Sequence, residues 1–222
     1  PFVMERIYFD NAATTSLDPE VLEAMMPYLT EKFGNPSSIY SYGREGRMAV
    51  EQARKSTARL LNAHPAEIFF TSCGTEGTNT AIAAAIYDLG CRHIITSPIE
   101  HHATLHTVEY YRQKGDVAVH YVKLLPEGHV DLKDLEQLLS GIKSRTLVTL
   151  MHANNEIGNL LDLDAVGEIC KRYGAIFHSD TVQTVGHYPF DLKKTPVHFI
   201  TAAAHKFHGP KGIGMLYINE EV

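Results

Sequence analysis

The stretch Leu147-Val148-Thr149-Leu150-Met151 indicates how this chain folds. It is a short apolar run, and its composition suits a strand that is buried on both faces. A polar turn that begins at His152 follows the run and gives the strand a clear end. Strands of this kind are typical of parallel sheets that lie between two layers of helices.

Similar short apolar runs alternate with longer amphipathic segments through the middle of the chain. The predicted strands are Glu67–Thr71, His93–Ser97, Val117–Val122, Thr146–Met151, Ala175–Ser179, His198–Thr201 and Met215–Ile218. The predicted helices are Pro19–Lys32, Arg44–Asn62, Gly77–Leu89, Ala103–Lys114, Leu132–Leu139 and Leu163–Tyr173. This alternation predicts an α/β fold with a mainly parallel central sheet and helices on both faces.

Two aspartates mark predicted helix starts. Asp18 precedes Pro19, and Asp131 precedes a run rich in leucine. Both are good capping residues at the point where an apolar period begins. In the helix 44–62, the side chains with helical period are Ala49, Ala53, Thr57, Leu60 and Leu61, and we expect them to face the core.

Composition excludes several classes of protein. The apolar share of 44% and the charged share of 21% are those of a soluble globule, and 222 residues suffice for one large domain or for one domain and a fragment. The net charge of -6 argues against nucleic-acid or anionic-membrane partners. We expect no membrane span and no signal peptide. The three cysteines lack CxxC spacing, which favours a reducing cytoplasm, and the 13 histidines form no obvious metal-ligand set.

In open α/β sheets, ligands bind outside the carboxyl ends of the strands, so the residues that follow each strand are the candidates for chemistry. Lys206 stands after the last but one predicted strand, in Ala203-Ala204-His205-Lys206-Phe207-His208-Gly209-Pro210-Lys211-Gly212. A lysine made neutral by burial can form a Schiff base with an aldehyde cofactor. The alternative is a solvated lysine beside a Gly-Pro turn.

Two further strand ends carry suggestive residues. Small and hydroxyl side chains run from Ser72 to Asn79 and expose backbone N–H groups for a phosphate, although a plain capping turn with Thr75 as the cap is the alternative. His101 and His102 follow the next strand. Either imidazole could stack on a ring or move protons, but adjacent side chains do not converge on one metal, and exposed loop histidines are also common.

The remaining strand ends supply amides and a carboxylate. Asn154 and Asn155 could bind a polar ligand or form an Asx turn. Asp180, followed by Gln183, could stabilise a protonated pyridine nitrogen or cap the next segment. Together, the strand ends offer an anion cup, a stacking imidazole, an acid for a ring nitrogen and a lysine. This is the set of groups that pyridoxal 5′-phosphate requires.

Longer motifs carry a family resemblance. They are Tyr8-Phe9-Asp10-Asn11-Ala12-Ala13-Thr14-Thr15, Phe33-Gly34-Asn35-Pro36-Ser37-Ser38, Thr71-Ser72-Cys73-Gly74-Thr75-Glu76, Glu100-His101, Met151-His152-Ala153-Asn154-Asn155-Glu156-Ile157-Gly158, His178-Ser179-Asp180-Thr181-Val182-Gln183 and His205-Lys206 with Gly209-Pro210-Lys211-Gly212. With these motifs the chain resembles the cysteine desulfurases, in the class V aminotransferase-like group of fold-type I pyridoxal-phosphate enzymes. The stretch Asn154-Asn155-Glu156-Ile157-Gly158 and the stretch from His205-Lys206 to Gly209-Pro210-Lys211-Gly212 favour the branch that serves iron–sulfur cluster assembly.

The resemblance implies a residue-by-residue assignment. Lys206 would bind the cofactor covalently and move the substrate α-proton, and His101 would stack on the ring and assist acid–base steps. Asp180 would pair with the ring nitrogen, Gln183 would hydrogen-bond the phenolic oxygen, and Asn155 would lie near that oxygen and the substrate carboxylate. Gly74, Thr75 and His205 would hold the phosphate. The substrate mouth would be lined by Asn11, Ala12, Ala13 and Asn35.

The resemblance also implies an organisation and partners. Residues 1–15 would form an N-terminal arm and residues 16–222 the cofactor-binding large domain, with the C-terminal small domain absent. The expected partners are L-cysteine, a second copy of the chain in a homodimer and a sulfur-acceptor protein. The expected product is L-alanine, with sulfur held as an enzyme persulfide.

Two departures from the family pattern stand out. Ala203 occupies a position where the family usually has a serine that binds the phosphate, so water or Thr201 would have to replace that hydroxyl. No cysteine follows Lys206, where the family has its nucleophile, and the substrate-binding arginine also belongs to that later part. We therefore expect an N-terminal segment that is inactive alone. The alternatives are another class V enzyme, such as a selenocysteine lyase or a small-acid aminotransferase, and a non-catalytic binding or scaffold segment.

Overall fold

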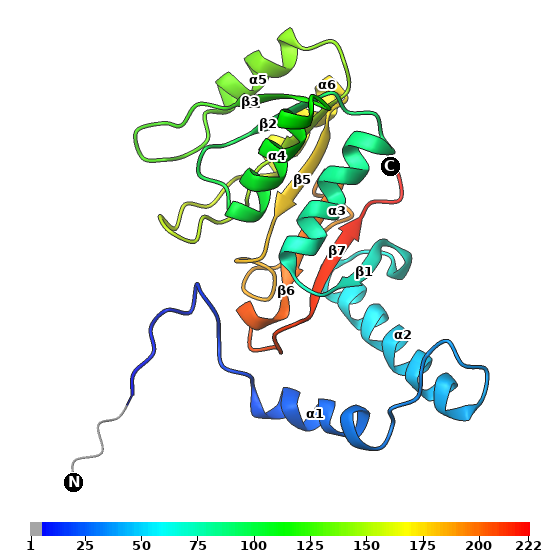
Figure 1. The fold of residues 1–222 in the computed structure, drawn as a ribbon. Helices are drawn as coiled ribbons and strands as arrows, with labels where there is room; N and C mark the ends of the chain where they lie inside the picture. Colours follow the sequence, from blue (N-terminus) through cyan, green and yellow to red (C-terminus); the bar gives the residue numbers. More distant parts are fainter. Residues whose placement is uncertain (1–5) are drawn as a thin grey trace.

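A seven-stranded sheet organises residues 6–222, which are the residues that the computed structural model describes (Figure 1). The strands are β1 (Ile68–Thr71), β2 (His93–Thr96), β3 (Ala118–Tyr121), β4 (Thr146–Thr149), β5 (Ile176–Asp180), β6 (Phe199–Ala203) and β7 (Gly214–Ile218), in the spatial order β1-β7-β6-β5-β4-β2-β3. The α/β prediction is confirmed. Of the predicted arm 1–15, residues 1–5 lie outside the described part of the chain.

Most of the sheet is parallel. Strands β3, β2, β4, β5 and β6 pair in parallel, so their carboxyl ends meet at one edge of the sheet. Strand β7 runs against both of its neighbours, β6 and β1. Its position between them means that β1 joins the sheet only through β7. All residues of β4, β5 and β6 are buried, as the apolar run at 147–151 predicted.

Helices cover both faces of the sheet, as expected. The helices are α1 (Pro19–Thr30), α2 (Ser41–Leu61), α3 (Gly74–Tyr87), α4 (His102–Lys114), α5 (Leu132–Gly141) and α6 (Leu163–Tyr173). One apolar cluster joins α3 and α4 to the sheet, and another joins it to α5, α6 and the end of α2. Helix α1 has no buried residue and lies away from the sheet (Figure 1).

Local sequence explains where the helices begin. The Asp18 carboxylate accepts a hydrogen bond from the Glu20 N–H at 2.8 Å, and the Asp131 carboxylate accepts one from the Lys133 N–H at 2.9 Å. Each satisfies a backbone donor that the first helical turn leaves free. Both predicted caps are therefore confirmed.

The buried face of α2 differs from the predicted one. Ala58 and Leu61 face the core, whereas Leu60 is 76% exposed and Ala53 is exposed. The apolar period of this helix can be drawn through either set, and packing in the apolar cluster that contains Ile68 of β1 selects Leu61. The predicted membership of Ala53 and Leu60 in the core face was wrong.

Three element ends matter for the site. Strands β5 and β6 continue to Asp180 and Ala203, so these residues end the strands rather than follow them. Helix α3 begins at Gly74, three residues before the predicted start at Gly77, because Cys73 serves as its N-cap. The capping alternative for Thr75 is thus wrong, since Thr75 lies inside the first helical turn.

Candidate active site

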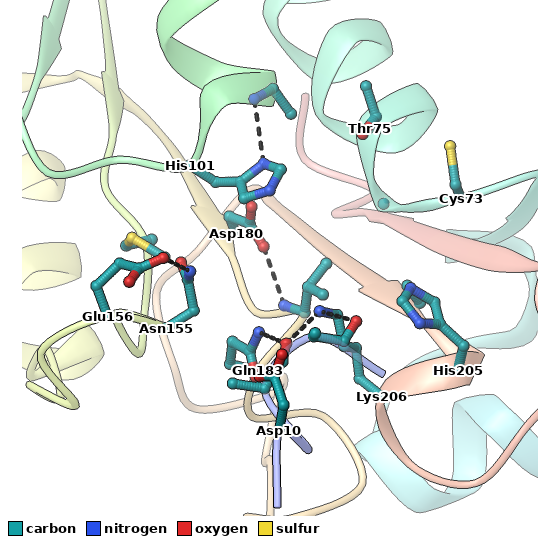
Figure 2. A pocket seen from close by; sticks show the side chains of 17 residues that line it. Asp10, Cys73, Thr75, His101, Asn155, Glu156, Asp180, Gln183, His205 and Lys206 are labelled. Carbon is teal, nitrogen blue, oxygen red and sulfur yellow. Dashed lines mark hydrogen bonds between the residues drawn. The ribbon is translucent and has the colours of Figure 1, made fainter. Parts of the chain in front are cut away.

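A cavity of about 560 Å³ opens at the carboxyl edge of the sheet. Its walls come from the N-terminal arm, the start of α3, the turn before α4, the 151–156 loop and the ends of β5 and β6 (Figure 2). The predicted residues that line it are Ala12, Ala13, Gly74, Thr75, His101, Asn155, Asp180, Gln183, His205 and Lys206. Segments distant in sequence thus converge here, as expected for strands whose carboxyl ends share one edge.

The start of α3 forms one wall of the cavity. The Cys73 thiol accepts the Glu76 N–H at 3.5 Å, while the backbone N–H groups of Gly74 and Thr75 make no hydrogen bond within residues 6–222. A Cβ at Gly74 would lie 2.5 Å from a methyl carbon of Val182, so a larger residue would clash with this wall. Two free N–H groups at the positive end of a helix dipole suit an anion.

Asp180 places a carboxylate at the floor of the cavity. Its side chain accepts one hydrogen bond within the described chain, from the Val182 N–H at 3.0 Å, and no ion pair there includes it. Burial raises the pKa of Asp180, and the Val182 N–H, His101 and Lys206 oppose that rise. Asp180 is 6% exposed, so a cationic or N–H-bearing ligand in the cavity would supply the partner that a buried carboxylate needs.

His101 lies over Asp180, with the two side chains directed toward one another (Figure 2). The imidazole Nδ1 accepts the Ala103 N–H at 3.1 Å, which makes His101 the N-cap of α4. This bond fixes the ring by one nitrogen and leaves the other nitrogen for a ligand or a proton. The cap therefore holds the ring at the wall of the cavity, where it stays exposed.

Lys206 lies in the 3₁₀ turn that follows β6, and the arm holds its amine in place (Figure 2). The amine donates to the carbonyl oxygens of Ala12 and Ala13, the latter at 2.9 Å, and the Gln183 amide also donates to Ala12 at 2.9 Å. Burial lowers the pKa of Lys206, while the negative charges of Asp180 and Asp10 oppose the change. The direction agrees with the prediction of a lysine that loses its proton more readily.

His205 and Ala203 complete the wall beside Lys206. The His205 Nδ1 lies 3.1 Å from the Thr14 hydroxyl, and burial, then Lys206 and Lys211, lower the pKa of the imidazole. Ala203 lines the cavity with a methyl group. The suggested substitute hydroxyl was wrong, because Thr201 is fully buried and its hydroxyl lies 3.3 Å from that of Thr78, outside the cavity.

The two adjacent asparagines have separate roles. Asn154 forms the Asx turn, because its side-chain oxygen accepts the N–H groups of Glu156 at 2.8 Å and Ile157 at 3.0 Å. Asn155 lines the cavity and donates to the Glu156 carboxylate at 2.8 Å. The turn therefore holds Asn155 toward the cavity. The Asx-turn alternative is confirmed for Asn154, and ligand binding stays a prediction for Asn155.

Two predicted substrate residues do not line this cavity. Asn11 lies in the arm between lining residues, and the Asn35 side chain accepts the Ser37 N–H at 2.9 Å in the loop between α1 and α2. Conversely, Asp10, Cys73 and Glu156 line the cavity without a predicted role. Each of the three directly adjoins a residue to which the family motifs assign a role, and this adjacency is the sequence signal that could have identified them.

Glu100 is a further residue that sequence reasoning overlooked. Its carboxylate is 6% exposed, accepts the Ser97 hydroxyl at 2.7 Å through one oxygen and has no partner within residues 6–222 for the other. Burial raises the pKa of Glu100 to about 8, and the charge of Asp180 contributes to the rise. The carboxyl of Glu100 is therefore protonated at neutral pH. Glu100 directly precedes His101, whose ring lies over Asp180.

The cysteines separate clearly. Cys91 and Cys170 are buried, and burial raises the pKa of their thiols to about 11 and about 12. Both are inert core residues at neutral pH. Cys73 is half-buried and borders the cavity. Within residues 6–222, no helix is long and apolar enough to cross a membrane, and no three potential ligands gather as a metal site.

Comparisons with known proteins agree with one another. The family model described as "Aminotransferase class-V" matches residues 7–222. The "Cysteine desulfurase" of Trichormus azollae is 46% identical, over 99% of this chain and 54% of that protein. The "Cysteine desulfurase IscS" of Dictyoglomus turgidum is 46% identical, over 96% of this chain and 54% of that protein. The chain thus spans about half the length of the curated relatives it matches.

Solved structures show the same fold. A "NIFS-LIKE PROTEIN" has a TM-score of 0.92 and 43% identity, and the match covers 98% of this chain and 60% of that chain. A structure described as "SspA in complex with cysteine" has a TM-score of 0.91 and 32% identity, with 97% and 62% covered.

Proposed function

The chain belongs to the class-V aminotransferase family, and we propose that it forms the cofactor-binding domain of a cysteine desulfurase. Enzymes of this kind use pyridoxal 5′-phosphate. The proposed reaction converts L-cysteine to L-alanine and leaves the sulfur as an enzyme persulfide for iron–sulfur cluster assembly. Relatives named cysteine desulfurase and a similar structure in complex with cysteine support this choice.

The observation that carries the proposal is the uncompensated carboxylate of Asp180. Asp180 borders the same cavity as an amine whose pKa is lowered and as two free N–H groups at the start of α3. A ligand that satisfies all three must bring a cationic N–H, an electrophilic carbon and an anion. Pyridoxal phosphate carries these groups on one ring, and the volume of about 560 Å³ suits a ligand of that size.

The binding roles follow from the chain's own groups. The N–H groups of Gly74 and Thr75, with His205, would bind the phosphate, and Asp180 would accept the ring N–H. His101 would cover the ring and Gln183 would donate to the phenolic oxygen. Because the arm carbonyls already accept from Gln183 and Lys206, cofactor binding exchanges those hydrogen bonds for bonds to the ligand.

Lys206 and His101 would handle protons. A lysine whose pKa is lowered carries a neutral amine more often, so Lys206 can both attach the cofactor and take the proton from the substrate α-carbon. Bound pyridoxal phosphate supplies an electron sink for the negative charge at that carbon. The free nitrogen of His101 can return a proton on the opposite side of the site.

The substrate assignment extends the proposal to the mouth of the cavity. Asn155, Ala12 and Ala13, which line the cavity, would contact L-cysteine. Cys91 and Cys170 are too buried to accept sulfur. We propose that the sulfur-accepting cysteine and the arginine for the substrate carboxylate lie outside these 222 residues. A homodimer, a sulfur-acceptor protein and a cytoplasmic location complete the proposal.

Borohydride trapping tests the cofactor assignment. We expect the protein mixed with pyridoxal phosphate to develop a visible absorption band, and reduction to leave the cofactor attached to Lys206 in a peptide map. Lys206→Ala should abolish the label, whereas Lys211→Ala, which changes an exposed lysine of the same turn, should retain it. Label at another lysine, or no band, would contradict the assignment.

The carboxylate gives the second arm of that test. Asp180→Asn keeps the shape but cannot hold a ring proton by charge, so the affinity for pyridoxal phosphate should fall by about tenfold or more, since a charge-assisted hydrogen bond contributes roughly 1.5–3 kcal/mol. Asp10→Asn removes a charge from the same cavity without this contact and should bind nearly as well as the wild type. Equal affinities for all three proteins would remove the argument from Asp180.

A further inference from the structure

His102 and His106 lie one helical turn apart on the exposed side of α4, which packs beside α3 on one face of the sheet (Figure 1). Residues four apart in a helix are neighbours on its surface. The two imidazole centroids are 5.3 Å apart, and their planes are inclined by 32°. The rings are therefore close enough to bind one small ion between them, without any backbone movement.

The nitrogens of both rings are available. Neither His102 nor His106 makes a side-chain hydrogen bond within residues 6–222. Another close pair, His93 and His120, differs in this respect, because its nitrogens are 2.9 Å apart in a half-buried hydrogen bond. The pair on α4 thus combines proximity, exposure and free ligand atoms.

From this geometry we propose that His102 and His106 chelate a divalent transition-metal ion. Imidazole nitrogens suit Cu²⁺, Ni²⁺ and Zn²⁺, whereas Mg²⁺ and Ca²⁺ prefer oxygen ligands. Since no third histidine, cysteine or carboxylate within residues 6–222 joins the pair, water fills the remaining positions. The site is exchangeable and differs from the closed sites that stabilise a fold.

The location gives the site its interest. His102 follows His101 directly, and their ring centroids are 6.1 Å apart. A bound ion would therefore lie next to the imidazole that covers Asp180, at the first turn of the helix that His101 caps. The site is outside the cavity, since neither His102 nor His106 lines it.

Titration of the full protein, without an affinity tag and without cofactor, with Ni²⁺ tests the proposal by calorimetry. Binding by two imidazoles exceeds binding by one because the second contact is intramolecular, so His106→Ala should weaken binding by at least about tenfold. His102→Ala should do the same. His129→Ala, which removes a solitary exposed histidine, should leave the tightest binding unchanged.

A composition-matched variant separates chelation from histidine content. His106→Tyr combined with Tyr110→His keeps every residue count, but moves the second imidazole about 12 Å from His102 along the helix. Both positions are exposed, so the fold should tolerate the exchange. The variant should bind Ni²⁺ as weakly as His106→Ala. Undiminished binding in this variant or in both alanine variants would overturn the proposal, and so would binding that is lost equally in His129→Ala.

Discussion

The strands β4, β5 and β6 and the helix α1 are held in different ways. Every residue of the three strands is buried, and their side chains pack against helices on both faces. Helix α1 has no buried residue, and its apolar side chains Leu22, Met26 and Leu29 are exposed by 45% or more. The strands therefore depend on tertiary packing, whereas α1 depends on its Asp18 cap and on the few contacts of the arm.

Those few arm contacts concentrate at Thr15. The Thr15 N–H and hydroxyl both donate to the His205 carbonyl, at 2.8 Å and 2.9 Å, and the hydroxyl accepts the His208 N–H at 2.7 Å. Thr15 is 7% exposed, unlike its neighbours in the arm. The difference from the sheet teaches that hydrogen bonds, several of them made by Thr15, and not an apolar interface, attach the arm beside Lys206.

The largest effect is expected in the central strands. Phe177 is fully buried in β5, so Phe177→Ala should lower the free energy of unfolding by about 3–5 kcal/mol, through lost transfer energy and a residual cavity. Urea denaturation measures this change. Phe177→Leu keeps more of the volume and should cost clearly less. A loss below 1 kcal/mol for the alanine variant, on the order of a surface substitution, would show that packing does not hold these strands.

Glu100 should make stability depend on pH in an unusual direction. Its pKa is about 8 in the folded chain against 4.5 ordinarily, so between these values the folded state binds more protons than the unfolded state. Stability therefore falls as the pH rises through this window, by an amount on the order of a few kcal/mol, since a tenfold change in proton affinity equals about 1.4 kcal/mol. Glu100→Gln should remove this part of the pH profile.

Urea denaturation of both proteins at pH 5 and pH 8 isolates the Glu100 contribution, because every other titrating group is shared. Burial lowers the pKa of His178 from 6.5 to about 3. Below pH 6.5 the unfolded state therefore binds more protons at this residue, so His178 lowers stability as the pH falls, whereas Glu100 lowers it as the pH rises. If the difference between wild type and Glu100→Gln stays constant across the pH range, Glu100 is ionised in the folded chain.

A smaller effect is expected at the arm. Thr15→Val keeps the shape but removes the hydroxyl that bonds to His205 and His208, and one such hydrogen bond contributes about 1 kcal/mol. The loss of global stability should be about 1–2 kcal/mol, while proteolysis of residues before α1 should accelerate more strongly. Ser16→Ala, which removes an adjacent exposed hydroxyl that makes no hydrogen bond within residues 6–222, is the matched control. Unchanged proteolysis in Thr15→Val would mean that other contacts hold the arm.

The smallest effect is expected on α1. Leu29 is 64% exposed, so Leu29→Ala should change the free energy of unfolding by less than about 0.5 kcal/mol. Thermal and urea denaturation should agree on this value. A loss of 2 kcal/mol or more would place Leu29 in an apolar contact and would weaken the contrast between α1 and the sheet.

Much of this fold could be predicted because its signals are local. Apolar runs such as 147–151 locate the buried strands, and Asp18 and Asp131 locate helix starts by a bond to a nearby N–H. The start of α3 could not be located, because a cysteine is a weak cap and a glycine a weak helix former. Leu60 and Leu61 fit the helical period almost equally, and only tertiary contact distinguishes them.

The site shows the same limit. The motifs predicted which residues surround the cavity, because parallel strands bring their carboxyl ends together. The burial of Glu100 could not be predicted, since a glutamate before a histidine is ordinarily solvated and its enclosure, with the bond from Ser97, forms only in the folded chain. That the Thr201 hydroxyl does not replace the serine hydroxyl in the cavity could not be predicted either, because the direction of the Thr201 side chain depends on where Thr78 packs.

The place of β7 in the sheet also has a consequence for the order of synthesis. Thr71, at the end of β1, pairs with Gly214, and β1 has no other strand neighbour in the described sheet. A ribosome that adds about 5–20 residues per second completes the later partner roughly 7–30 s after the earlier one. Until β7 is made, β1 has no strand partner, and the turn at Gly74 is placed by the contacts of α3 with α4, β5 and β6. Full attachment of this proposed phosphate-binding turn to the sheet therefore waits for β7, which is synthesised after Lys206.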